Sequence, residues 1–223
     1  MKTWVISDTH CNEDQLTIPK DIELVIHAGD STNSKDWLYN EKEFNKFIDW
    51  YANLDAPNKI LIAGNHDAWA TKKWCKDKVK DLGIYYLEHD YLELNGKLFF
   101  GSPYTPTFSD WHFMVSRSKI YRYWEVLEEN IDVLITHGPP KTILDLSFNK
   151  DGILEFCGDM PLFNKVKKVQ PKYHVFGHIH NVDFVINSGI RTLPDLDTTF
   201  INASCVTDRK MDVVSSHGFI INL

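Results

Sequence analysis

Aspartate, asparagine and histidine side chains directly follow five short apolar runs of this sequence. The segments that carry them are Asp8-Thr-His10, Gly29-Asp30, Gly64-Asn-His-Asp67, Thr136-His-Gly138 and Gly177-His-Ile-His180. Short β-branched runs that stop at glycine or at polar residues are typical of buried strands, and open α/β sheets bind ligands at the carboxyl ends of such strands. We therefore expect these side chains to meet at one edge of a sheet.

Oxygen and imidazole ligands without a nearby thiolate suit Mn²⁺, Fe, Zn²⁺, Ni²⁺ or Mg²⁺, and this choice stays open with Mn²⁺ favoured. A spacing of two residues puts both side chains of a pair on one face of an extended backbone, so each pair can chelate one cation. The sequence offers seven candidate ligands, more than one tetrahedral ion needs: Asp8, His10, Asp30, Asn65, His137, His178 and His180. Two cations about 3.5–4 Å apart can share a carboxylate, clamp a phosphate and activate a water for in-line attack. The pattern predicts phosphoryl chemistry.

The elements that must position these residues alternate between strand and helix patterns. A first helix is predicted after Ser34, a candidate cap, because Phe44, Phe47, Ile48 and Tyr51 follow helical spacing. A lysine-rich helix is expected over residues 70–81, with Trp74 facing inward. Next, Asn95-Gly96 stands between two apolar runs and predicts a hairpin with a type I′ turn.

The second half of the chain also alternates between helix and strand patterns. Ile120, Tyr123, Trp124 and Leu127 repeat helix spacing, and residues 141–157 read as irregular. Pro161 marks the start of a last helix. The expected strands of the tail are 182–186, 189–193, 200–202 and 218–222. Periodicity thus favours the α/β class, and we expect two mixed β-sheets packed as a sandwich flanked by helices.

Composition limits the organisation and the partners. The 223 residues contain no linker-like stretch, so we expect a single domain over residues 1–223. The net charge of −7 includes no basic block, so nucleic acid is not the expected partner. Four separated cysteines without a C-x-x-C pair, and no leader or long apolar span, favour a cytoplasmic protein without a membrane anchor. The oligomeric state stays open.

In order and interval, the five motifs resemble those of the calcineurin-like metallophosphoesterase superfamily. The shared patterns are D-x-H, G-D, G-N-H-[DE], a lone histidine and G-H-x-H, and they extend from Asp8 to His180. The resemblance implies the two-sheet fold of that family and two metal ions. It implies one ion held by Asp8, His10 and His180, a second held by Asn65, His137 and His178, and Asp30 as the bridge. It also implies that His66 is the acid beside the leaving group and that Asp67 orients His66.

A narrower resemblance is to the metallophosphoesterase-domain-containing proteins first known from brain, a branch similar to class III cyclic-nucleotide phosphodiesterases. It rests on Ile6-Ser-Asp-Thr-His10, Ala63-Gly-Asn-His66, Thr136-His-Gly-Pro-Pro140, Pro171-Lys-Tyr-His-Val-Phe-Gly177 and Ile201-Asn-Ala-Ser204. Some members of that branch carry glycine where this chain has His178, so this chain has the fuller ligand set. The segment after Asp30 lacks the G-D-x-x-D-R-G pattern of Ser/Thr phosphatases, which weighs against a protein phosphatase.

The leading interpretation is a dinuclear metal-dependent phosphodiesterase that acts on a small soluble ester such as a cyclic nucleotide. The alternatives are a phosphomonoesterase, a nuclease, or a non-catalytic protein-binding scaffold that keeps the fold. His66 together with a full ligand set distinguishes an enzyme from a scaffold, because a scaffold has no physical need for them.

Three other features have competing interpretations. The aromatic segment over residues 101–119 is either a wall on which a nucleobase stacks, with Arg117 near a phosphate, or an aromatic cluster under a long loop. The cluster is favoured. His27 and His174 lie inside apolar runs, which is typical of hydrogen-bonded core residues. Asn202 has a turn role or helps to close the site.

Overall fold

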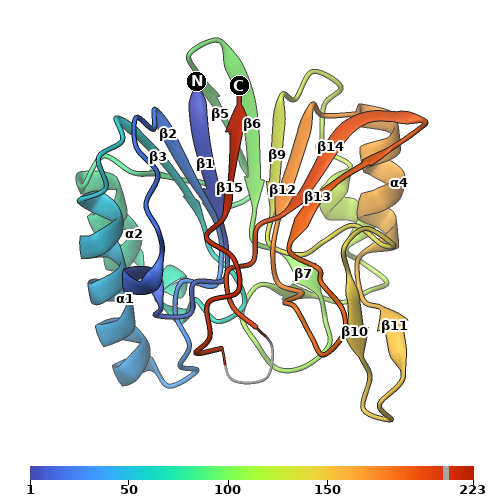
Figure 1. Ribbon diagram of the computed structural model, residues 1–223, viewed down its shortest axis with the longest axis horizontal. Coiled ribbons are helices and arrows are strands. Elements are labelled where there is room, and N and C mark those ends of the chain that lie inside the picture. Colours follow the sequence, from blue (N-terminus) through green and yellow to red (C-terminus); the bar gives the residue numbers. More distant parts are fainter. Residues whose placement is uncertain (208–210) are drawn as a thin grey trace.

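Two β-sheets face each other in the computed structural model, which describes residues 1–207 and 211–223 (Figure 1). The first sheet has the strand order β15-β1-β2-β3-β4. Its strands pair in parallel except for β15, which is antiparallel to β1. In that order they span Phe219–Asn222, Lys2–Ile6, Leu24–Ala28, Asn58–Ile62 and Tyr85–Tyr86.

The second sheet has the strand order β13-β14-β12-β9-β6-β5. Its four inner strands are parallel, and the two edge strands β13 and β5 are antiparallel to their neighbours. In that order the strands span Gly189–Leu193, Leu196–Asn202, Tyr173–Phe176, Val133–Thr136, Lys97–Ser102 and Asp90–Leu94. Both sheets mix strand directions, so the predicted sandwich of two mixed sheets is confirmed.

Helices cover the outer face of each sheet. The first sheet carries α1 (Trp37–Ala52) and α2 (Lys73–Asp81), and the second carries α3 (Tyr121–Trp124) and α4 (Met160–Val169) (Figure 1). Short 3₁₀ helices are η1 (Glu13–Gln15) and η2 (Ala68–Thr71). Buried apolar side chains form three layers, one between the sheets and one under each set of helices. This burial is the main source of stability for the frame that holds the loops.

The parallel strands of both sheets end at the same edge, the lower one in Figure 1. The sheets also touch there, because the Ser7 amide donates to the Ala203 carbonyl at 2.9 Å and the Cys205 amide donates to the Ser7 carbonyl at 2.9 Å. Two short strand pairs lie beyond this edge: β7 (Thr105–Pro106) with β8 (Met114–Val115), and β10 (Leu146–Phe148) with β11 (Leu154–Phe156). The architecture thus brings the ends of five ligand-bearing strands together.

Several local predictions need correction in the first half of the chain. Asp36, not Ser34, caps α1, since its Oδ1 accepts hydrogen bonds from the amides of Leu38 and Tyr39. Trp74 is 45% exposed and does not face inward; Cys75 and Val79 are the buried residues of α2. α2 begins at Lys73, after the 3₁₀ turn η2, rather than at residue 70 as expected. The residue of α2 that faces the core is therefore Cys75, one position after Trp74. The predicted hairpin is confirmed, with positive φ angles at Asn95 and Gly96.

In the second half, the helix predicted around residues 120–127 is a single turn, although Ile120, Trp124 and Leu127 are buried as expected. The interval 182–186 is not a strand, and its Phe184 and Ile186 side chains are exposed. The interval 141–157, predicted as irregular, contains the β10–β11 hairpin. α4 and the strands over 189–193, 200–202 and 218–222 are confirmed within longer or shifted bounds.

Candidate metal centre

The backbone turns sharply where the site residues leave their strands. Asp8, His10, Asp30 and His178 have φ angles of 50°, 44°, 55° and 68°, in the left-handed region that non-glycine residues seldom adopt. Each such conformation costs roughly 1–3 kcal/mol and persists only where the surrounding structure enforces it. These turns let side chains at the ends of β1, β2 and β12 approach one another, as a ligand site requires.

The first ligand cluster contains Asp8, His10 and His180, whose ligand atoms all lie within 4.8 Å of one another. All three residues are buried. The Asp8 carboxylate accepts hydrogen bonds from the His178 amide and from Ser204 Oγ at 2.9 Å, and it pairs with His180 Nε2 at 3.0 Å. Burial alone would raise the pKa of Asp8, but the hydrogen bond and positive charge of His180 hold it well below its usual range. Asp8 is therefore an ionised ligand.

The second ligand cluster contains Asp30, His137 and His178, again within 4.8 Å of one another. Asn65 joins it, because its Oδ1 lies 3.0 Å from His137 Nε2. Burial would lower the pKa of His137, but the Asp30 carboxylate raises it to about 9. This point of the fold thus stabilises a positive charge, which a bound divalent cation would supply in place of the proton.

Asp30 stands between the clusters. Its Oδ2 lies 3.7 Å from His10 Nε2 in the first cluster and 3.3 Å from His137 Nε2 in the second. Its Oδ1 accepts a hydrogen bond from the His66 amide at 2.7 Å. Burial would raise the pKa of Asp30, but the charges of His137 and His66 hold it well below the usual range. A single ionised oxygen therefore faces both groups of ligands.

The histidines show which nitrogen each would offer to a metal. Nδ1 of His10 lies 3.1 Å from the Thr32 carbonyl, and Nδ1 of His137 lies 3.0 Å from the Ala28 carbonyl. A carbonyl only accepts, so Nδ1 of each ring carries a proton, the arrangement typical of metal-binding histidines. In His10 this leaves the lone pair on Nε2, whereas His137 also carries a proton on Nε2 and would give it up to bind an ion. His10 Nε2 is buried without a hydrogen-bond partner among the described residues. Burial also lowers the pKa of His10 to about 4 and that of His178 to about 3, so both rings are neutral ligands. The donor set fits two divalent cations.

Two glycines allow the loops to approach this closely. Gly29 has a φ of 98°, and a Cβ there would lie 2.6 Å from His137 Nδ1. A Cβ on Gly177 would lie 2.0 Å from Asp8 Oδ2. Real Cβ atoms do not come so near to other heavy atoms, so a larger residue at either position would displace a ligand.

Asp67 does not contact the ring that it was expected to orient. Its two oxygens accept hydrogen bonds from the amides of Gly64, Asp30, Ser31 and Thr32 and from the hydroxyls of Ser31 and Thr32. The His66 ring is oriented instead by the Asn33 carbonyl, 2.8 Å from its Nδ1. Asp67 is thus a buried anchor that joins the loops after β2 and β3, and the role implied by the resemblance needs this correction.

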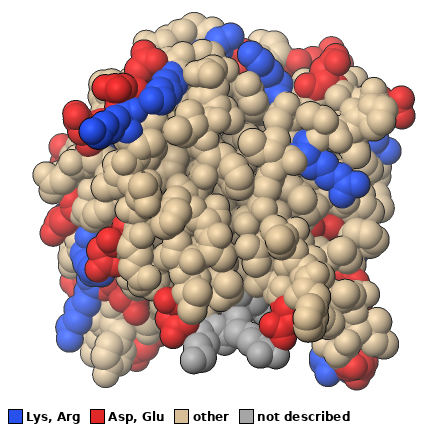
Figure 2. All heavy atoms as spheres, in the orientation of Figure 1, with Lys and Arg blue, Asp and Glu red and all other residues tan. Residues whose placement is uncertain are grey.

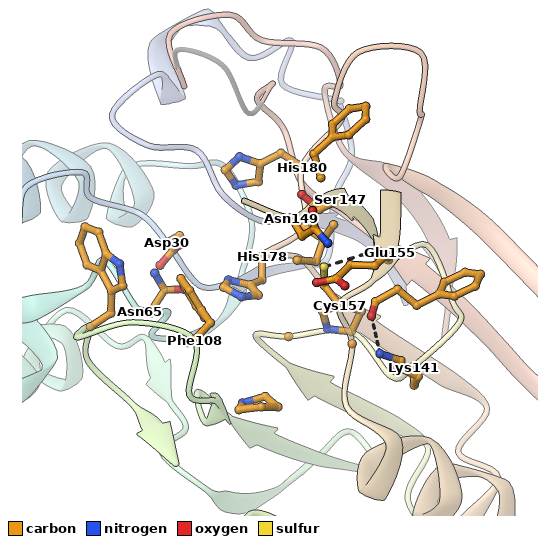
Figure 3. Close-up of a pocket in the computed structure, with 18 of the residues that line it drawn as sticks. Asp30, Asn65, Phe108, Lys141, Ser147, Asn149, Glu155, Cys157, His178 and His180 are labelled. Carbon is orange, nitrogen blue, oxygen red and sulfur yellow. Dashed lines mark hydrogen bonds between the residues drawn. The ribbon is translucent and has the colours of Figure 1, made fainter. Parts of the chain in front are cut away.

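A cavity of about 900 Å³ opens over the ligands. Asp30, Asn65, His66, His178 and His180 contribute to its lining. Figure 3 shows His178 between Phe108 and the β10–β11 hairpin that carries Ser147 and Glu155, with Asp30 and Asn65 beyond Phe108 in this view. Lys141 reaches the same wall, where its Nζ donates to the Phe156 carbonyl. The ligand clusters therefore form the floor of a cavity with two distinct walls.

The aromatic segment over residues 101–119 forms in one part a wall of the cavity and in another part a separate aromatic cluster. Phe108, Trp111 and Arg117 line the cavity. Tyr104 and Phe113 instead contact each other with ring centres 5.9 Å apart, and Tyr104 packs on Tyr123 at 4.6 Å. One part of the segment is thus a wall and the other part is an aromatic cluster. His112 donates its backbone amide to the Asn65 carbonyl.

Two contributions to the site were missed in the sequence. The β10–β11 hairpin forms a wall, and its signal is the alternation Leu146-Ser-Phe148 and Leu154-Glu-Phe156 around the turn residues Asn149 to Gly152. Ser204 binds Asp8, which no local pattern indicates because β14 lies far away in the sequence.

The remaining polar residues have structural roles. His27 and His174 are fully buried, and each ring pairs with a threonine hydroxyl, so their prediction as core residues is confirmed. Asn202 Nδ2 donates to the carbonyls of Leu144 and Ile179, which ties the loop before His180 to the base of the hairpin.

Known proteins share this sequence pattern and fold. The family profile described as calcineurin-like phosphoesterase matches residues 1–182. Human metallophosphoesterase domain-containing protein 1 is 33% identical over 227 residues, which cover 91% of this chain and 65% of that protein's length. UPF0046 protein C25E10.12 of Caenorhabditis elegans is 35% identical over 234 residues, which cover 92% of this chain and 75% of that protein.

Solved structures agree on the fold. Phosphopantetheinyl hydrolase of Mycobacterium tuberculosis superposes with a TM-score of 0.61 at 14% identity, covering 99% of this chain and 95% of that one. TT1561 of Thermus thermophilus gives a TM-score of 0.57 at 10% identity, covering 90% and 88%. At such low identity these similarities concern the fold alone. The family profile, which spans every ligand described above, shows that this chain belongs to the calcineurin-like phosphoesterases, a family of phosphoester hydrolases that use divalent metals.

Proposed function

We propose that this protein is a dinuclear metal-dependent phosphodiesterase that hydrolyses small soluble phosphodiesters such as cyclic nucleotides. The observation that carries the proposal is the position of Asp30 Oδ2 between Nε2 of His10 and Nε2 of His137, at the floor of the cavity. An oxygen shared in this way suits two ions held close together. Two divalent cations, when bound, polarise a phosphoryl group and lower the pKa of a water so that it can attack in line.

The protein's own groups have separate tasks in this mechanism. Asp8, His10 and His180 would hold one ion, Asn65, His137 and His178 the other, and Asp30 both. His66 donates Nδ1–H to the Asn33 carbonyl. To act as the acid, the ring must carry a second proton on Nε2, which passes to the leaving oxygen and leaves a neutral imidazole. Asp67 keeps the His66 loop in place through its hydrogen bonds to neighbouring amides.

The charges around the cavity favour a diester over a monoester. Its basic lining residues are Arg117, Lys141 and Lys150, and its acidic ones are Asp30, Asp151 and Glu155. This balance suits a singly charged diester better than a doubly charged monoester. Phe108 on one wall and Phe148 and Phe156 on the other offer apolar surface to an organic group.

A long nucleic acid is a poorer substrate. On the face shown in Figure 2, basic and acidic side chains alternate near the rim, and the described residues of that face form no continuous basic stripe.

None of the described helices is long and apolar enough to cross a membrane. The four cysteines are free thiols, which supports our proposal of a reducing, cytoplasmic environment.

Turnover of bis-p-nitrophenyl phosphate and of p-nitrophenyl phosphate tests the proposal. We expect the diester to be the better substrate, EDTA to abolish its hydrolysis, and added Mn²⁺ to restore it. Preference for p-nitrophenyl phosphate would favour a monoesterase. If protein loaded with Mn²⁺, Zn²⁺ or Fe²⁺ hydrolyses no diester or monoester of a broad panel, the scaffold interpretation replaces ours.

A further inference from the structure

The indole of Trp111 lies against the imidazole of His66. Their ring centres are 4.1 Å apart and their planes differ by 30°. A second ring, that of His10, meets His66 edge-on at 4.8 Å with an angle of 87° between the planes. His66 is therefore in contact with one metal-cluster residue and with one residue of the cavity wall.

Trp111 is itself held in place by the loops around the site. Lys35 Nζ lies 5.1 Å from the centre of the indole ring and forms an ion pair with Asp110 at 3.0 Å. The amide of His112 donates to the Asn65 carbonyl at 3.3 Å. The wall segment is thus attached to the same loop that carries His66, so the indole and the imidazole keep a fixed relation.

The hydrogen bond to the Asn33 carbonyl does not fix the imidazole ring by itself. The side-chain torsion that turns a histidine ring has broad minima, so one hydrogen bond at Nδ1 still allows the ring to tilt. A flat indole at 4.1 Å restricts that tilt, since aromatic pairs prefer a narrow set of offset geometries. With both contacts present, the ring of His66, which lines the cavity, keeps one orientation.

We propose that Trp111 is a positioning residue that holds the His66 ring in the orientation needed to protonate the leaving oxygen. The proposal rests on the proposed function, because it requires His66 to act on a leaving group. It differs from the role of Trp111 as a surface for substrate stacking. A stacking surface would affect substrate affinity, whereas a positioning residue affects the proton transfer.

The test compares Trp111→Ala, Trp111→Phe and His66→Ala on aryl diesters with good and poor leaving groups, loaded with Mn²⁺. We expect Trp111→Ala to lower kcat roughly tenfold for the poor leaving group, because a misaligned acid loses efficiency, and to change it little for the good one. KM should stay near that of the wild type. Trp111→Phe should recover most of the loss, since a phenyl ring can also cover the imidazole. His66→Ala should show the same leaving-group pattern with a larger loss.

A tryptophan far from the site provides the matched control. Trp74 is half exposed on α2 and contacts Trp37 and Phe44, so Trp74→Ala removes the same side chain without touching the cavity. Its kcat should equal that of the wild type for both leaving groups. Melting curves of all variants ensure that the measured proteins are folded.

A second readout needs no turnover. In metal-free protein, the ring protons of His66, assigned with His66→Ala, should move downfield by NMR in Trp111→Ala as the indole ring current is lost, and should move back in part in Trp111→Phe. Unchanged His66 resonances would overturn the proposal. Equal kcat losses for both leaving groups, or a rise in KM alone, would also overturn it while the proposed function stands. A wild type without any turnover would instead overturn the proposed function, and the positioning role of Trp111 with it.

Discussion

In the first ligand cluster, the Asp8 carboxylate accepts hydrogen bonds from Ser204, from the His178 amide and from His180, and all three ligands are buried. In the second cluster, His178 is only partly buried and lies beside Phe108, whose side chain is 55% exposed at the cavity. The first cluster is the more enclosed of the two, because only its His180 lines the cavity, whereas Asp30, Asn65 and His178 of the second cluster all line it. We infer that the first ion is bound more tightly and that the second ion meets the substrate.

The largest effect is expected from Asp30→Asn, which removes the charge that the two clusters share. Loss of a residue that only hydrogen-bonds a metal ligand typically lowers metal affinity or activity about 10–100-fold. Asp30 would contact the metal ions directly, so its loss should lower activity by more than about 100-fold. Metal analysis after dialysis should show less than two bound ions. Asp55→Asn, at an exposed position, is the control and should behave like the wild type. Two tightly bound ions in Asp30→Asn would remove Asp30 from the bridging role.

A pair of exchanges separates the two clusters. His178→Gly should weaken the second ion by at least about 10–100-fold while the first remains, so that activity collapses at limiting Mn²⁺ and partly returns in excess. His180→Gly should weaken the first ion instead. Calorimetric titration with Mn²⁺ measures both sites, and a melting curve accompanies each variant. Metal-activation curves of His178→Gly that superimpose on the wild type would refute its assignment as a ligand.

A smaller effect is expected from Ser204→Ala. The hydroxyl donates to Asp8 Oδ2 at 2.9 Å, so its loss should reduce the affinity of the first ion by about tenfold. The second ion should bind as before. Ser188→Ala, a hydroxyl exchange outside both clusters, serves as the control. Equal losses at both ions would contradict the separation of the clusters.

The smallest effect is expected from His174→Gln, which changes how the free energy of unfolding depends on pH. It tests a residue of the core rather than of the ligand clusters. Burial lowers the pKa of His174 to about 3. Below pH 6.5 the unfolded chain therefore takes up a proton that the folded protein does not, so the free energy of unfolding decreases as the pH falls from 6.5 toward 3. In metal-free protein, His174→Gln should make the free energy of unfolding less dependent on pH in this range, by about 1.4 kcal/mol per pH unit. An unchanged slope in urea titrations at pH 4.5 to 6.5 would exclude His174 as a source of the acid sensitivity.

The positions of most buried strands along the chain could be predicted because each of them is an apolar run that ends in glycine or polar residues. The two groups of ligands came from the family resemblance rather than from spacing, since His10 and His180 are 170 residues apart in number and meet only through the tertiary fold. The capping residue of a helix was harder to predict. Ser34 and Asp36 are equally good capping residues by type, and only the observed start of α1 distinguishes them.

Other features depended on contacts that no local pattern carries. Trp74 was expected to face the core because it is large and apolar. The side of α2 that packs on the core depends instead on how the helix continues from η2, and it carries Cys75 and Val79. The interval 182–186 has the composition of a strand and lacks a neighbour of the second sheet to pair with among the described strands. Asp67 follows His66 directly in the sequence, yet its oxygens are fully engaged by backbone amides and hydroxyls.

The left-handed backbone at His178 has an evolutionary consequence. Glycine adopts a φ of 68° without strain, so exchange of this histidine for glycine removes a ligand and relieves the backbone in one step. A lineage that no longer depends on the second ion would meet no stability barrier to that exchange and could even gain robustness from it. The reverse exchange must accept the strain before the new ligand is useful, so this position favours loss of the ligand over its recovery.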